Sequence, residues 1–205
     1  MIRFIISVFF FSFSVIMSAG NVGEMFVAMP DSVIPYINKE LRQDLVNMKN
    51  IDPETNASLA TMFKSKIILK NISDNMLTFD IGSVGFEMAR LKSSDNGDSI
   101  YCLLRTVATP EKETYIYLYD KDWKLLRQLD YGDMDFLKKP DTMQVDEYQE
   151  LTSMAEFTLI EAHFGEQPEV LELICDFPML TADEKKRIKA FGLQRKLKWD
   201  GESFK

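Results

Sequence analysis

The spacing of apolar positions predicts an amphipathic helix in the first third of the chain. Within residues 24–48, apolar side chains recur every three or four positions, and mostly polar side chains fill the positions between them. Asp31 or Ser32 can cap this helix, and Pro35 falls early enough to lie in its first turn. The apolar stripe consists of Ile34, Ile37, Leu41, Leu45 and Met48. A short helical turn is expected next, over residues 54–63.

From residue 66 the period changes from helical to alternating. Six runs rich in β-forming residues follow one another, separated by short polar turns. They cover residues 66–72, 76–81, 85–92, 99–109, 114–120 and 124–129. Strands joined by so few residues pair antiparallel, because a parallel crossover needs roughly a dozen residues or more. The runs therefore predict an antiparallel meander, with the N-terminal helix covering its apolar face.

The last third of the chain mixes short helices with strands. Helices are expected at residues 132–137, 146–154 and 181–191. Strands are expected at residues 157–164, 170–176 and 194–199, and the Asp200-Gly201 turn should fold Phe204 back beside the last of them. The segments predict an α+β fold: an antiparallel meander sheet covered by an N-terminal amphipathic helix, with a smaller α/β-hairpin C-terminal half. Residues 21–205 then form a single domain, either undivided or built as two lobes, 21–130 and 131–205.

Residues 1–20 have the pattern of a cleavable signal peptide. Arg3 is their one charged residue, and residues 4–17 are almost wholly apolar. The segment ends in small side chains that a signal peptidase accepts: Ser18, Ala19 and Gly20. Because the apolar run is shorter than the ~20 residues that span a bilayer, the segment predicts export. The protein is expected to be periplasmic or secreted, with no transmembrane anchor after cleavage.

Composition narrows the class of function. The 205 residues carry 32 acidic and 24 basic side chains, a formal net charge of −8, which argues against binding nucleic-acid phosphates as the main role. One His and two Cys exclude zinc fingers, multi-histidine metal sites and disulfide-dense folds. The sequence contains no Gly-x-Gly-x-x-Gly, Walker, Cys-x-x-Cys or His-Glu-x-x-His motif. We therefore predict no cofactor, no metal and no nucleic-acid partner, and assign no catalytic residue.

The two cysteines lie in strand-like segments. Cys102 alternates in step with Leu104, and Cys175 with Leu173, so each is expected to point at apolar neighbours. In an exported protein they can form a disulfide that ties the two halves of the chain together. The alternative is two buried, unpaired thiols that pack as small apolar side chains. The sequence leaves both open.

His163 is the only imidazole, so any histidine-dependent catalysis has to use it. Glu161 and Glu166 are near enough in sequence to orient it, but no Gly-x-Ser-x-Gly setting for a nucleophile occurs. The pattern favours a partly exposed histidine at a strand end over a catalyst. The acidic clusters around residues 120–122 and 130–135 favour turn-forming aspartates over a Ca²⁺ loop, since the glycine and distal glutamate of an EF-hand are missing.

Three tyrosines alternate along one predicted strand. Tyr115, Tyr117 and Tyr119 lie on the face opposite Ile116 and Leu118. If the two aliphatic residues face the core, the tyrosines form a row on the outer face. Such a row either stabilises neighbouring strands through cross-strand contacts or serves as a binding platform. It is the most site-like surface that the sequence predicts.

The segment Met-Pro-Asp-Ser-x-x-Pro-Tyr-Ile, residues 29–37, resembles the start of an uncharacterised family of exported Bacteroidetes proteins, known only as a domain of unknown function. The closing Leu-x-Trp-Asp-Gly-x-x-Phe, residues 197–204, is consistent with this resemblance over nearly the whole chain. The resemblance implies a cell-envelope or secreted protein and supplies no catalytic residues. It also implies O-glycosylation at Asp-[Ser/Thr]-apolar sequences, for which Ser99, Ser32 and Thr142 are the candidates.

These features favour an exported, non-enzymatic binding or interaction module of the cell envelope. Its expected partner is a protein, a peptide or a glycan. The alternative is a hydrolase that acts on glycan or peptide through carboxylates, with His163 as a helper.

Overall fold

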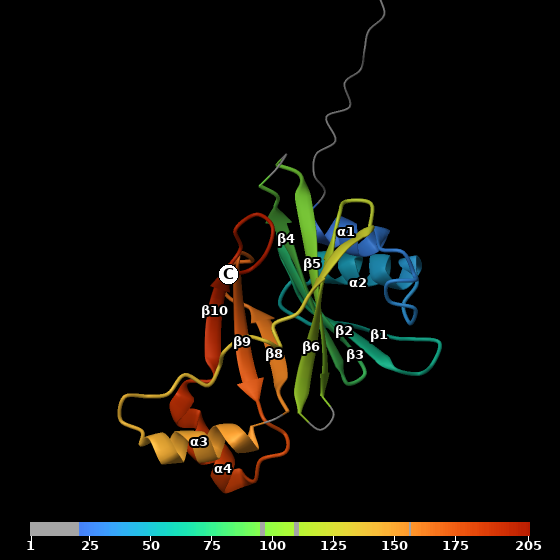
Figure 1. The fold of residues 1–205 in the computed structure, drawn as a ribbon. Coiled ribbons are helices and arrows are strands. Elements are labelled where there is room, and N and C mark those ends of the chain that lie inside the picture. The colour runs from blue at the N-terminus through green and yellow to red at the C-terminus, as the bar shows by residue number, and fades with distance from the viewer. Residues whose placement is uncertain (1–20, 95–96, 109–110, 156) are drawn as a thin grey trace, which may run out of the picture.

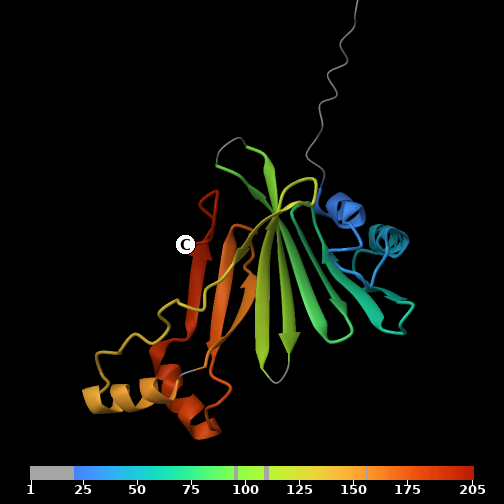
Figure 2. The ribbon, with the colours of Figure 1, turned by 45° about the vertical axis from the view of Figure 1, so that its right-hand side comes forward.

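The computed structural model describes residues 21–94, 97–108, 111–155 and 157–205. Within these ranges the chain forms four α-helices and two antiparallel sheets (Figures 1 and 2). The α+β fold class predicted from the sequence is thereby confirmed. The predicted signal peptide lies outside the described residues.

A seven-stranded sheet accounts for the predicted meander. Its strands lie in chain order, and each pairs antiparallel with the next. They are β1 (Ala57–Ala60), β2 (Lys66–Ile72), β3 (Met76–Ile81), β4 (Val84–Lys92), β5 (Ser99–Ala108), β6 (Lys112–Tyr119) and β7 (Leu125–Leu129). The six alternating runs correspond to β2–β7. The helical turn expected over residues 54–63 is wrong, because pairing with the edge of β2 makes part of this segment the strand β1.

Two helices, rather than one, precede the sheet. α1 spans Val22–Ala28, and α2 spans Lys39–Ile51 with its N-terminus capped by the Asn38 side chain. The predicted start at Asp31 or Ser32 is wrong. Prolines follow Met29 and Ile34, and a residue before proline is disfavoured in helical conformation. The intervening segment therefore forms turns, and the helix begins only after them.

A three-stranded sheet forms the smaller half, in the order β10-β9-β8. The smaller half contains α3 (Val145–Met154), β8 (Leu159–Phe164), β9 (Val170–Asp176), α4 (Ala182–Ile188), the 3₁₀ helix Lys189–Phe191 and β10 (Gln194–Lys198). Thr181 caps α4 in a capping box with Glu184. Phe204 folds back to pair with Trp199, as expected.

The short helix expected at residues 132–137 is wrong. The Asp130 carboxylate accepts the backbone N–H of Gly132, and the Asp135 carboxylate accepts that of Leu137. Aspartate side chains that bond the backbone two residues on stabilise turns in place of a helix. This segment therefore crosses between the sheets in turns and extended chain.

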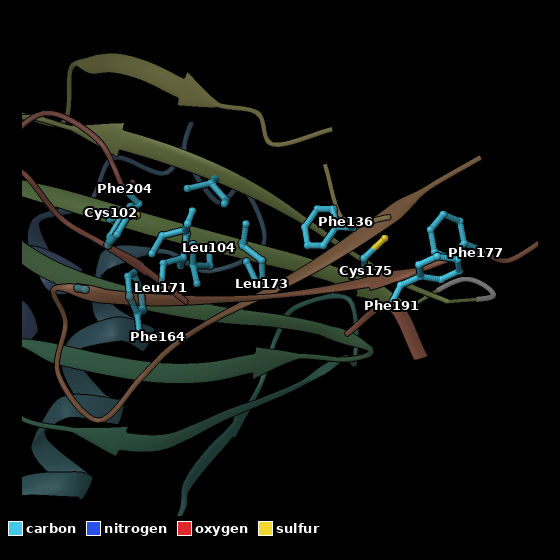
Figure 3. Packing of buried hydrophobic residues seen from close by; sticks show 14 of the residues in the cluster. Cys102, Leu104, Phe136, Phe164, Leu171, Leu173, Cys175, Phe177, Phe191 and Phe204 are labelled. Carbon is cyan, nitrogen blue, oxygen red and sulfur yellow. The ribbon is translucent and has the colours of Figure 1, made fainter. Parts of the chain in front are cut away.

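The alternation of β4 and β5 places their side chains in two cores. One core lies between α1, α2 and one face of the large sheet, and includes Phe79, Met88 and Leu103. The other lies between the two sheets and includes Leu104 and Leu173 (Figure 3). The predicted helical cover is thus confirmed on one face, where α1 and α2 pack against β1–β4. The small sheet covers part of the other face.

Candidate functional site

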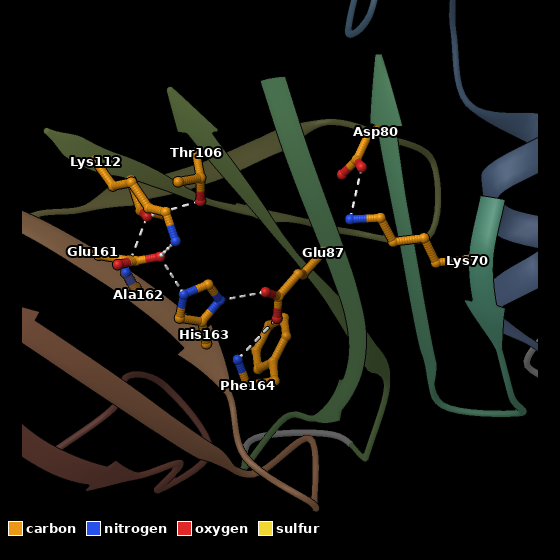
Figure 4. Close-up of polar contacts among 10 residues, drawn as sticks. Lys70, Asp80, Glu87, Thr106, Lys112, Glu161, Ala162, His163 and Phe164 are labelled. Carbon is orange, nitrogen blue, oxygen red and sulfur yellow. Dashed lines mark hydrogen bonds and ion pairs between the residues drawn. The ribbon is translucent and has the colours of Figure 1, made fainter. Parts of the chain in front are cut away.

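His163 lies in a cluster of charged side chains where the small sheet meets the large one (Figure 4). From β8, its Nδ1 is 2.6 Å from Glu87 Oε1 on β4, and its Nε2 is 2.6 Å from Glu161 Oε1. The second oxygen of Glu87 accepts the backbone N–H of Phe164 at 3.0 Å. Glu87 therefore holds both the ring and the backbone of β8.

The start of β6 extends this cluster. Lys112 Nζ lies 2.6 Å from the same Glu161 oxygen that contacts His163. Thr114 Oγ1 accepts the backbone N–H of Ala162 at 2.9 Å and also lies 2.9 Å from Thr106 Oγ1. A cavity of about 240 Å³ opens beside these groups, and the Lys70–Asp80 ion pair lines its far wall. The cluster joins β4, β6 and β8.

The two carboxylates favour the protonated form of His163. The hydrogen bond to Glu87 raises the pKa of His163, partial burial works against this, and Glu161 adds to the rise. For Glu161, burial acts to raise the pKa, but hydrogen bonds from Lys112 and His163 outweigh it, so the pKa is lowered. Two carboxylates facing two ring nitrogens thus bind an imidazolium.

This geometry gives His163 a structural role. A general base needs an unprotonated ring nitrogen within reach of the proton it removes. Here both nitrogens donate to carboxylates, and the nearby Thr114 hydroxyl is bonded to Ala162 and Thr106 instead. The sequence predicted Glu161 as an orienting neighbour but missed Glu87, which is 76 positions away. Glu166 is not among the residues that contact the ring.

The row of tyrosines lies where the sequence predicted it. Ile116 and Leu118 are buried between the sheets, so Tyr115, Tyr117 and Tyr119 occupy the other face of β6. All three tyrosines are half-buried. Tyr119 is anchored, since its ring lies 5.1 Å from that of the buried Trp123. Tyr115 donates a hydrogen bond to Glu113 on the same strand.

The surface around these tyrosines is open. α1 and α2 pack on this face of the sheet at β1–β4, whereas the tyrosines lie on β6. Arg105 pairs with Tyr115 across the strands, and Gln128 pairs with Tyr117. The side chains of Arg105 and Gln128 are exposed. Leu125 pairs with Tyr119 and is 51% exposed. We call Arg105, Tyr115, Tyr117, Leu125 and Gln128 the tyrosine face.

The remaining candidate residues are dispersed over the molecule. Ser32 and Thr142 lie in exposed turns. The Val33 N–H donates to the Pro30 carbonyl in the first turn, and the Met143 N–H donates to the Pro140 carbonyl in the second. Ser99 is the first residue of β5, pairs with Lys92 and is half-buried. O-glycosylation at these three residues stays a prediction.

Both cysteines belong to the core between the sheets. Each is buried and carries a free thiol, and in the view of Figure 3 Leu104 and Leu173 lie between Cys102 and Cys175. Burial raises the pKa of the Cys102 thiol and raises that of Cys175 to about 12. The structure thus corresponds to the alternative of two unpaired thiols that pack as apolar side chains.

Residues 29–37, the first motif singled out in the sequence, surround a buried guanidinium. Arg42, 1% exposed, donates to the carbonyl oxygens of Met29 and Ile37 and lies 3.0 Å from the Asp31 carboxylate. The periodicity placed Arg42 on the polar side of the helix, which is wrong, because the preceding turns fold over it. The motif therefore has a structural role in the described part of the chain.

The chain is similar to proteins whose function is not known. A family described as "Protein of unknown function (DUF3256)" matches residues 14–204. A solved domain of an uncharacterised protein from Porphyromonas gingivalis W83 superposes with a TM-score of 0.71 at 22% identity, covering 91% of this chain and 99% of that one. No functionally curated protein matches the sequence. None of the helices in the described ranges has the length and apolar character needed to cross a bilayer.

Proposed function

This chain belongs to the DUF3256 family of proteins of unknown function, and we propose from its own geometry that it is an exported binding module of the cell envelope. Its partner is a protein, a peptide or a glycan. The tyrosine face is the contact surface. No step of chemistry is required of it.

The open tyrosine face is the observation that carries this proposal. Aromatic rings beside an arginine and an amide are the side chains that dominate recognition surfaces, because they combine apolar area with hydrogen bonding. Leu125 adds an apolar group that is 51% exposed at the end of the row. Tyr119 stacks on Trp123 and holds this end of β6 in place. The surface is thus built before any partner arrives.

A hydrolase is the second candidate, because Glu87 and Glu161 flank His163 beside a cavity. In this arrangement, however, both carboxylates are bound to the imidazolium and stabilise the contact between the sheets. Catalysis would require one of them to leave the ring. We therefore rank binding first.

Replacing Tyr117 by serine should weaken partner binding by about tenfold or more, because aromatic anchors at the centre of an interface carry most of its energy. The measurement is binding of purified wild-type and variant protein to immobilised bacterial oligosaccharides and short peptides. Phe157→Ser is the matched control, since Phe157 is an exposed aromatic residue outside the tyrosine face. Leu125→Ser tests the same face without altering a half-buried ring.

The binding proposal fails if wild-type protein binds neither class of probe, or if Tyr117→Ser and Leu125→Ser bind as well as wild type. The same pooled glycans and peptides serve as substrates for the hydrolase alternative. Turnover by wild type that disappears in His163→Asn would favour the hydrolase and contradict the non-enzymatic assignment.

Export and glycosylation are tested together by intact mass. We expect protein purified from its native envelope to begin near residue 21 and to be heavier than the bare chain by the mass of a glycan. Ser32→Ala and Thr142→Ala should each remove mass, because these hydroxyls lie in exposed turns. A chain that still starts at Met1 would contradict export, and a mass equal to that of the bare mature chain would contradict glycosylation.

A further inference from the structure

The loop between β1 and β2 presents two large apolar side chains to solvent. Met62 is 84% exposed and Phe63 is 64% exposed. The ring of Tyr36, itself 54% exposed, lies 6.3 Å from that of Phe63 in an edge arrangement. The loop is at the outer end of its strands, on the side of the molecule away from the small sheet (Figures 1 and 2). Three large apolar groups therefore gather at one tip.

Hydrogen bonds within the loop hold much of its backbone. Thr61, which is buried, accepts the N–H groups of Phe63 and Ser65 through its hydroxyl, each at 3.2 Å. Its own N–H donates to the Ser65 carbonyl, and the Lys64 N–H donates to the Thr61 carbonyl. Four of the loop's amide groups are thus bonded inside the loop. Amide groups that are bonded inside the loop need no partner when the tip enters the less polar part of a membrane interface.

The charge of this tip is opposite to that of the chain. The whole sequence has a net charge of −8, but no Asp or Glu occurs between Glu54 and Asp74. Lys64 and Lys66 are exposed, and neither forms an ion pair with a described side chain. Lysines beside an apolar tip extend their charged ends toward lipid headgroups while the apolar groups enter the interface.

We propose that this tip docks on an anionic lipid surface, with Met62, Phe63 and Tyr36 entering the interface and Lys64 and Lys66 contacting the headgroup phosphates. The proposal is independent of the tyrosine face, which lies on β6 and β7. It makes the protein a peripheral membrane protein that holds its partner-binding surface near a bilayer.

Vesicle flotation tests this. The protein is expressed with its own leader and purified after export, and its N-terminus is read by mass. It is mixed with vesicles of phosphatidylethanolamine and phosphatidylglycerol, or of phosphatidylcholine alone. We expect wild type to float with the anionic vesicles and at least about tenfold less with the zwitterionic ones, and added salt to weaken the binding.

The double variant Met62→Ser/Phe63→Ser should lose about tenfold or more of the binding. Its matched control, Phe157→Ser/Met179→Ser, removes an exposed Phe and an exposed Met elsewhere and should bind as wild type does. All samples share one N-terminus, so differences arise from the substitutions. Thermal melts of each variant confirm folding. Wild type that does not float with anionic vesicles, or equal loss in both double variants, overturns the proposal, as does self-association through the tip without lipid binding.

Discussion

Replacing Arg42 by methionine should lower the free energy of unfolding by about 3 kcal/mol, a large part of the ~5–15 kcal/mol that stabilises a typical domain. The guanidinium is buried, and its bonds to Met29 and Ile37 satisfy two backbone carbonyls in the turns before α2. Methionine fills the volume but leaves those carbonyls without a donor. Because Asp31 is 61% exposed, its ion pair contributes little.

Urea denaturation of wild type and variant measures this difference. Arg105→Met is the matched control, since Arg105 is exposed on β5, and it should change stability by less than about 0.5 kcal/mol. Arg42→Lys should fall between the two, because one ammonium group does not reproduce the planar fork of donors. A loss below about 1 kcal/mol for Arg42→Met would contradict the role assigned to residues 29–37.

The fold was predictable where local pattern determines structure. Strand alternation locates β2–β7, and short turns force them into an antiparallel meander. The Thr181 cap and the return of Phe204 are equally local. The errors have three sources. Prolines and the bonds of Arg42 hold the residues before α2 in turns, and pairing with β2 makes part of residues 54–63 a strand. Asp130 and Asp135 bond the backbone two residues on and form turns where a helix was expected.

The two candidate sites differ in the same way. The tyrosine face could be predicted from the alternation of side chains along β6 alone, because Ile116 and Leu118 identify the buried side of this strand. The His163 cluster does not, since Glu87 and Lys112 are brought to it by the packing of β8 across β4 and β6. Of the two carboxylates that contact His163, only its sequence neighbour Glu161 was predicted from the sequence. Pairing between sheets has no period in the sequence, so no pattern could have shown it.

The ion cluster predicts a pH-dependent contact between the sheets. Glu87→Gln should lower the free energy of unfolding by roughly 1–2 kcal/mol near pH 6, a value discounted because His163 is 39% exposed. The variant keeps an acceptor for the Phe164 amide but removes the negative charge beside the imidazolium. Glu166→Gln is the matched control, an exposed carboxylate in the turn between β8 and β9 that is not among the groups that shift the pKa of His163, and it should cost less than about 0.5 kcal/mol.

The sign of the pH effect follows from the pKa of His163, which is raised above its ordinary value of 6.5. Its stabilising contribution is complete below that ordinary value and is lost as the pH rises through the folded pKa. The gap between wild type and Glu87→Gln should therefore be widest near pH 6 and should narrow at alkaline pH, as measured by urea denaturation across the range. Glu161, whose pKa is lowered below 4.5, contributes in the opposite direction, and its share is lost as the pH falls. A gap that stays constant from pH 6 to alkaline pH would mean that His163 is neutral in the folded protein, and the ring would then again be available as a base.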